Sequence, residues 1–118
     1  RLSRPINNKS RITYGSNVTG NLNTTVLSFG ELVIINLDIQ VTTALSAYGR
    51  LAEGLPKNAT SDSHFIFRKV DNGATATAYV DNQGRLSLNA GNSMATGRWQ
   101  GTVIYSTDAG LSQDYNPE

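Results

Sequence analysis

The sequence predicts an all-β protein, an antiparallel β-barrel or sandwich of about seven or eight strands. In the stretch Leu32–Thr42, every odd position from Val33 to Val41 is apolar and every even position from Asn36 to Thr42 is polar. Successive side chains of a strand point to opposite faces, so this stretch is predicted to be a long strand with one dry and one wet face. Shorter apolar runs follow at regular intervals between clusters of Gly, Asn, Asp and Ser, and no helical period is visible.

Shorter strands are expected on both sides of the long one. Each is a run of β-branched, aromatic or alternating residues bounded by turn residues. These strands are residues 11–14, 24–29, 65–70, 75–80, 85–90 and 98–106. The sequences Asp71-Asn72-Gly73 and Asp81-Asn82-Gln83-Gly84 predict tight turns, because Asn and Gly tolerate positive φ. Residues 15–23 and 57–63 are expected to be loops, and residues 44–53 to be irregular.

Two features of the long strand bear on association with other chains. Leu32 and Ile34 interrupt the alternation, which indicates burial on both faces at the start of the strand. Further along, the polar side chains of Asn36, Asp38, Gln40 and Thr42 lie on one face. That face is either exposed to solvent or part of a wet subunit interface.

With 118 residues, the chain is long enough for one domain with a single core. We interpret residues 1–10 as a linker or neck remnant, residues 11–107 as a β-barrel head domain and residues 108–118 as a polar C-terminal tail. No apolar run approaches the roughly 18 residues of a membrane span. A net charge of +1 without a basic cluster argues against nucleic acid as a partner.

The composition favours a non-catalytic protein. Cysteine is absent, which excludes disulfides, thiol catalysis and Cys-ligated zinc. His64 is the single histidine, and the chain has no nucleophile-elbow, zinc or calcium motif, so we expect no enzyme, no metal and no cofactor. The remaining enzymatic alternative is a pair of distant carboxylates acting on a glycoside. Abundant Asn, Ser and Thr with only 16% charged residues suits a sugar-binding surface, and equally an ordinary β-sandwich.

Four residues are candidates for contact with a ligand, and each has a structural alternative. Trp99 is either a core residue, as its strand partners suggest, or a platform under a sugar ring. His64 is either a hydrogen-bonded residue at a strand end or a polar ligand contact. Arg98 would pair bidentately with phosphate or carboxylate, unless it lies on a solvated strand face. Asp81 is first of all a turn residue, in a turn at a barrel end where ligands commonly bind.

Several stretches carry a family resemblance that covers roughly residues 11–107. After the long strand come Gly-Leu-Pro at 54–56, Ala-Tyr-Val-Asp-Asn-Gln-Gly-Arg-Leu-Ser-Leu at 78–88 and Trp-Gln-Gly-Thr-Val-Ile-Tyr at 99–105. In this order they resemble the C-terminal head domain of tail receptor-binding proteins from phages of Gram-positive bacteria, and are most similar to lactococcal phage heads.

The resemblance implies a function and a location. Such heads are small β-barrels that form homotrimers at the tip of the baseplate, in the virion. They attach to the host cell by binding cell-wall saccharides, often phosphate-containing polymers, without catalysis. Their sites lie near protomer boundaries and use Trp, His, Arg and Asp side chains, which by residue type points to Trp99, His64, Arg98 and Asp81. Two alternatives remain: a monomeric carbohydrate-binding module or lectin, and a structural tail decoration domain without a ligand.

Overall fold

The computed structural model describes residues 12–21 and 24–107, and this part of the chain contains nine β-strands and no helix. No helix long and apolar enough to cross a membrane is therefore found among these residues. The strands are β1 (Thr13–Tyr14), β2 (Val18–Gly20), β3 (Thr25–Phe29), β4 (Leu32–Val41), β5 (Arg50–Glu53), β6 (Ser63–Lys69), β7 (Thr75–Val80), β8 (Leu86–Leu88) and β9 (Gly97–Ser106).

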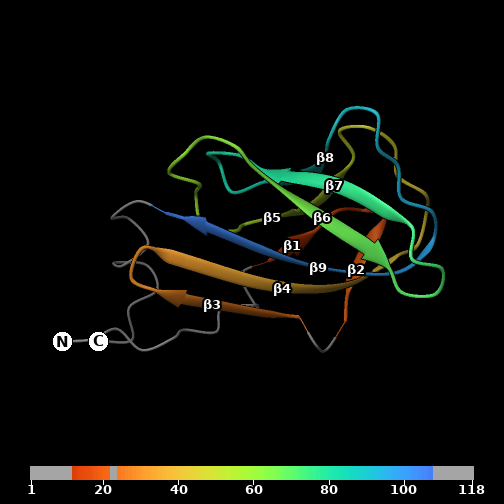
Figure 1. Ribbon diagram of the computed structural model, residues 1–118, viewed down its shortest axis with the longest axis horizontal. Coiled ribbons are helices and arrows are strands. Elements are labelled where there is room, and N and C mark those ends of the chain that lie inside the picture. Colours follow the sequence, from red (N-terminus) through yellow and green to blue (C-terminus); the bar gives the residue numbers. More distant parts are fainter. Residues whose placement is uncertain (1–11, 22–23, 108–118) are drawn as a thin grey trace.

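The strands form one antiparallel sheet that is nearly closed into a barrel (Figure 1). Its order is β1-β5-β8-β7-β6-β9-β4-β2, and β3 pairs with the part of β4 that β2 leaves uncovered. Strands β1 and β2 lie at the two ends of this order and are joined by a short turn, so the chain itself bridges the gap between the two edges. The predicted fold class, an all-β antiparallel barrel, is confirmed.

The long strand predicted from the alternating pattern is β4, and it organises one wall of the barrel. It pairs with β9 along its whole length, from Leu32 opposite Ser106 to Val41 opposite Gly97. The apolar odd positions all point inward and are buried: Val33, Ile35, Leu37, Ile39 and Val41. Period-2 patterning therefore predicts the inward-facing side of the strand correctly, while on the outer side Asp38 is also buried.

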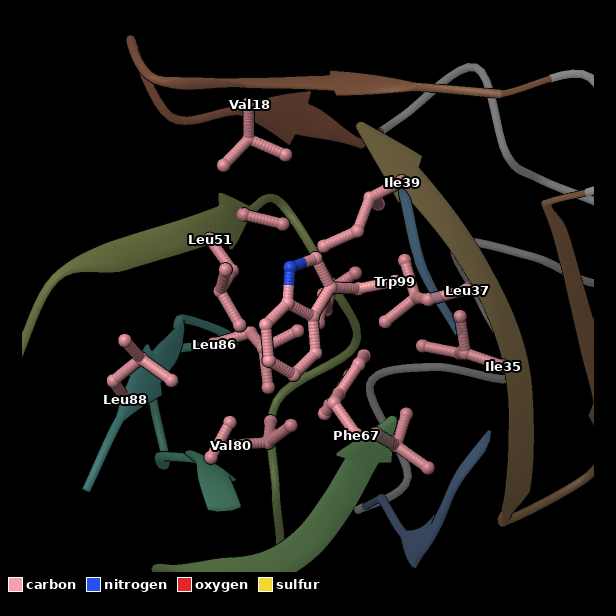
Figure 2. Close-up of a cluster of buried hydrophobic side chains, with 14 of the residues drawn as sticks. Val18, Ile35, Leu37, Ile39, Leu51, Phe67, Val80, Leu86, Leu88 and Trp99 are labelled. Atoms are coloured by element: carbon pink, nitrogen blue, oxygen red, sulfur yellow. The ribbon is translucent and has the colours of Figure 1, made fainter. Parts of the chain in front are cut away.

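The core lies between this wall and the strands on the other side of the barrel. Figure 2 shows Trp99 of β9 in the middle of this core, between Ile39 and Leu37 of β4 and Leu51 and Leu86 of β5 and β8. Strand β6 joins the two walls, since it pairs with β7 along most of its length and with β9 near its end.

The structure differs from the sequence prediction at three places. Strand β2 lies within the expected loop 15–23, and β5 lies within the segment expected to be irregular; both are short and have too few residues to show a period. Leu32 was expected to be buried on its outer side, but it is 41% exposed, because no described segment covers that face. The interpretations of residues 1–10 and 108–118 lie outside the described residues.

Candidate functional site

Trp99 is a core residue in this structure. Its side chain is 1% exposed, and its indole Nε1 donates a hydrogen bond to the carbonyl oxygen of Ala95 at 2.9 Å. Core side chains surround the ring (Figure 2), so neither face of the ring is open to a sugar. The structural alternative for Trp99 therefore holds here, and the stacking platform expected from the resemblance is not formed by this residue.

Arg98 is on the outer face of β9, where it is paired with a buried carboxylate of β4. Its Nε donates to Asp38 Oδ1 at 2.9 Å and its Nη2 donates to Oδ2. Asn21 and Gln100 also donate to this carboxylate, at 2.8 and 3.1 Å. The hydrogen bonds from Arg98, together with those from Asn21 and Gln100, outweigh burial and hold the pKa of Asp38 far below its usual range. Arg98 thus serves to link β4 and β9 through its ion pair with Asp38, more than to contact a ligand.

Asp81 stabilises the turn between β7 and β8. Its Oδ1 accepts hydrogen bonds from the backbone N–H groups of Gln83 and Arg85, at 2.9 and 3.0 Å, and its Oδ2 accepts one from Arg85 Nε at 2.7 Å. Burial acts to raise the pKa of Asp81, but the hydrogen bonds from Arg85 and Gln83 prevail and lower it. These contacts account for the residue as a turn former.

The structure does not bring the four predicted site residues together. Asp81 directly follows Val80, which pairs with Ser63, so Asp81 and His64 are at the same end of the sheet. Arg98 is at the other end, where its carbonyl oxygen accepts from the N–H of Val70. Six residues of strand separate Val70 from His64, a distance of about 20 Å. Of the four, His64 alone is exposed and outside the core, the salt bridges and the turns.

His64 belongs to a row of polar and aromatic side chains across four strands. In the register of the sheet, His64 pairs with Tyr79, and Tyr79 pairs with Ser87. Ser87 in turn pairs with Arg50. Because residues that pair directly across strands point to the same face, all four side chains lie on the outer face of β6, β7, β8 and β5. We call this set, with Tyr48 and Asn89 described below, the outer-face site.

The members of the row are held by contacts with one another. The rings of His64 and Tyr79 have centroids 5.9 Å apart with a tilt of 44°. Arg50 Nε donates to Ser87 Oγ at 2.9 Å, and its Nη1 lies 3.2 Å from Glu53 Oε2. Ser87 is itself buried, so it positions Arg50 and is not exposed to a ligand.

Asn89 completes the contacts of His64 and has an unsatisfied group. Its Nδ2 lies 2.9 Å from His64 Nδ1; when Nδ2 donates, Nδ1 is the acceptor and Nε2 carries the ring proton. His64 Nε2 is then a hydrogen-bond donor on an exposed side chain. In the described part of the chain, the buried Oδ1 of Asn89 has no hydrogen-bond partner. An unpaired buried carbonyl is costly.

Tyr48 is an exposed aromatic residue beside the same strands. Its side chain is 64% exposed, and its backbone N–H donates to the carbonyl oxygen of Leu88 in β8 at 2.9 Å. Its φ is 63°, a left-handed conformation that is unusual for a bulky residue and that recurs at functional sites. Sequence reasoning missed Tyr48, Tyr79, Arg50 and Asn89, and a Tyr next to Gly49 in a segment without a period was the only available signal.

This arrangement can bind but shows no constellation for catalysis. It offers aromatic rings, a guanidinium group, an imidazole N–H and amide groups on an open sheet face. Among residues 12–21 and 24–107, no group of three or more His, Cys, Asp and Glu side chains could hold a metal ion. A scan of known protein families finds none that matches the chain, and a search of curated proteins finds no similar sequence.

Proposed function

We propose that this domain is a host-recognition adhesin: the saccharide-binding head of a homotrimeric phage receptor-binding protein, located in the baseplate of the virion. The proposal joins the sequence resemblance with one structural observation. That observation is the outer-face site, in which His64, Tyr79 and Arg50 lie in register on a single face beside the exposed Tyr48.

The chemistry of this face suits neutral or anionic saccharides. Sugars present C–H groups that pack on aromatic faces, and hydroxyls that need uncharged donors and acceptors. Tyr48 and Tyr79 supply the first, and His64 Nε2 supplies a donor for the second. Arg50 adds a cation that would pair with phosphate on a cell-wall polymer. Three strand spacings separate Arg50 from His64, about 14 Å, which is longer than one sugar ring and favours an oligosaccharide.

Attachment would depend on many weak contacts. An open sheet face buries little of a ligand, so one site binds weakly. Three sites in a trimer, and many trimers in a baseplate, raise the overall avidity through effective concentration. Specificity would come from exposed polar groups, such as His64 Nε2, that a wrong sugar leaves unpaired.

The test is binding of the purified domain to an array of defined bacterial cell-wall saccharides, followed by titration of the best binder. We expect His64→Ala and Tyr48→Ala each to weaken binding about tenfold, the loss of roughly 1.4 kcal/mol from one polar or stacking contact. Both side chains are exposed, so folding is preserved. Val70→Ala is the control and leaves binding unchanged, because Val70 is exposed and lies just beyond the far end of β6.

The outcomes separate the proposal from its alternatives. Saccharide binding by the wild-type chain that both variants retain would place the site elsewhere. No binding to any saccharide would favour a structural decoration domain. Light scattering gives the solution mass: a mass near three times 12.7 kDa favours the trimeric head, and a saccharide-binding monomer favours a carbohydrate-binding module.

A further inference from the structure

We propose that copies of this chain associate through the outer face of β3, β4 and β9. The centre of that face is a row of aliphatic side chains, in which Leu27 pairs with Ile34 and Ile34 pairs with Ile104. Ile34 and Ile104 alternate along their strands with buried core residues, and Leu27 follows the buried Val26, so the row points outward. Leu32 follows the row along β4. We call Leu27, Leu32, Ile34 and Ile104 the aliphatic patch.

The aliphatic patch is partly exposed and contiguous. Leu32 and Ile104 are 41% and 53% exposed, and Leu27 and Ile34 are half-buried by their neighbours. A strand that is apolar on both faces is typical of a sheet covered on both sides. The described chain covers only the inner face of β4 at this point. Exposed apolar clusters of this kind mark interaction surfaces.

The charges around the patch favour a second copy of the same chain as the partner. The next positions on the same face are neutral: Thr102 Oγ1 donates to Asn36 Oδ1 at 2.8 Å, and Asn36 Nδ2 lies 3.4 Å from Thr25 Oγ1. Beyond them, Asp38 and Arg98 neutralise each other. From the patch to the Asp38–Arg98 pair, two identical faces therefore present no unpaired like charges to each other, as an interface between copies requires.

The C-terminal tail is a poorer match for the patch. Thr107 donates its N–H to the carbonyl oxygen of Glu31 at 2.8 Å, so residues 108–118 follow from the end of the sheet where the patch lies. These residues include only two bulky apolar side chains that could cover the aliphatic patch, and they carry three carboxylates. Burial of a carboxylate against aliphatic groups is costly. The residues concerned are Leu111 and Tyr115, and Asp108, Asp114 and Glu118.

The size of the face sets the strength of the contact. The ten residues of β4 extend about 33 Å, and three strands are about 14 Å wide. This footprint of roughly 460 Å² is below the roughly 800 Å² that each partner buries in a standard interface. Association through this face is therefore expected to depend on protein concentration.

The test is sedimentation of the 118-residue chain at concentrations from about 10 μM to about 1 mM. This range detects association with a binding free energy as weak as about −4 kcal/mol. We expect the wild-type mass to rise above 12.7 kDa with concentration. Ile104→Lys puts like charges at the centre of the contact and keeps the mass at 12.7 kDa throughout. Ile66→Lys is the matched control: Ile66 is 66% exposed on β6, opposite Thr77 and outside the patch, so this variant associates like the wild type.

Three results would overturn the proposal. The first is a wild-type chain that remains at 12.7 kDa at about 1 mM. The second is an Ile104→Lys variant that associates as the wild type does. The third is association that appears only after residues 108–118 are removed, which would identify this tail as the segment that covers the patch. The inference rests on the proposed function only for the expectation that copies of the chain associate. Saccharide binding by a chain that remains monomeric would overturn this inference and leave saccharide recognition standing. Association that Ile104→Lys abolishes, without binding to any saccharide, would do the reverse.

Discussion

Replacing Asp38 with Asn is expected to destabilise the barrel without changing its shape. The Asp38 side chain is almost completely buried and accepts hydrogen bonds from three other side chains. In Asp38→Asn, Oδ1 keeps the donors Arg98 Nε and Asn21 Nδ2, but Oδ2 becomes an amide that faces two donors, Arg98 Nη2 and Gln100 Nε2. Two favourable contacts are replaced by two donor–donor contacts.

The size of the effect follows from these contacts. A hydrogen bond that involves a charged group contributes about 1.5–3 kcal/mol when it is buried. Arg98 and Gln100 reach solvent and can be hydrated again in the variant, so the two losses together should be about 2–3 kcal/mol. For a domain of this size, this corresponds to a fall in Tm of roughly 8–12 °C.

The pH dependence of the effect is a second and independent check. Because the pKa of Asp38 is lowered in the folded state, its contribution to stability is present above the unfolded value of 3.8 and is lost as the pH falls below it. Urea unfolding should therefore show the full difference between the wild type and Asp38→Asn at neutral pH, and a smaller one at about pH 3. Asp71 and Asp81 also have lowered pKa values, but both proteins retain them, so their effects cancel.

The control is Asp62→Asn, which removes the same charge from an exposed side chain and is expected to leave Tm unchanged. A Tm for Asp38→Asn equal to that of the wild type, or a stability difference that persists undiminished at acid pH, would refute the role assigned to this carboxylate.

Two further predictions concern the core and one turn. Trp99→Ala should lower the free energy of unfolding by about 3–5 kcal/mol in urea titrations, since it leaves a large cavity in the core; a loss of less than about 1 kcal/mol would contradict its burial. Gly84→Ala and Gly91→Ala form a matched pair, with φ of +77° and +76°. A Cβ at Gly84 would lie 2.0 Å from the carbonyl oxygen of Leu55, whereas nothing lies within 4 Å of one at Gly91. In thermal unfolding, Gly91→Ala should lower the free energy of unfolding by about 1 kcal/mol and Gly84→Ala by at least about 3 kcal/mol. Equal decreases for the two variants would exclude the clash with Leu55.

The fold could be predicted because period-2 patterning is local. The alternation in β4 and the turn residues on either side of β7 indicate strands without any knowledge of their partners. The alternation of faces within β9 also favoured the core alternative for Trp99, because Val103 and Tyr105 point to the same face of the strand as Trp99. The sequence prediction did not identify β2 and β5, because these short strands form only by pairing with β4 and β8.

The outer-face site could not be predicted, because it depends on register. His64, Tyr79, Ser87 and Arg50 come from four strands, and their alignment follows from pairings between strands far apart in sequence. The Asp38–Arg98 ion pair, which withdraws Arg98 from the predicted site, joins residues 60 positions apart. The left-handed φ of Tyr48 is likewise a product of tertiary context, since Tyr has no local preference for it.

The two proposed surfaces lie on different strands of the barrel, and their placement links them. In the strand order of eight places, β8 and β4 are four places apart. The outer-face site extends from β5 to β6 and the aliphatic patch from β9 to β3, so the two surfaces adjoin where β6 pairs with β9. No residue belongs to both surfaces, so association through the patch would leave the part of the site on β7, β8 and β5 outside the contact. Each copy in the assembly would then contribute its own site, and this is the arrangement in which weak single sites add up to firm attachment.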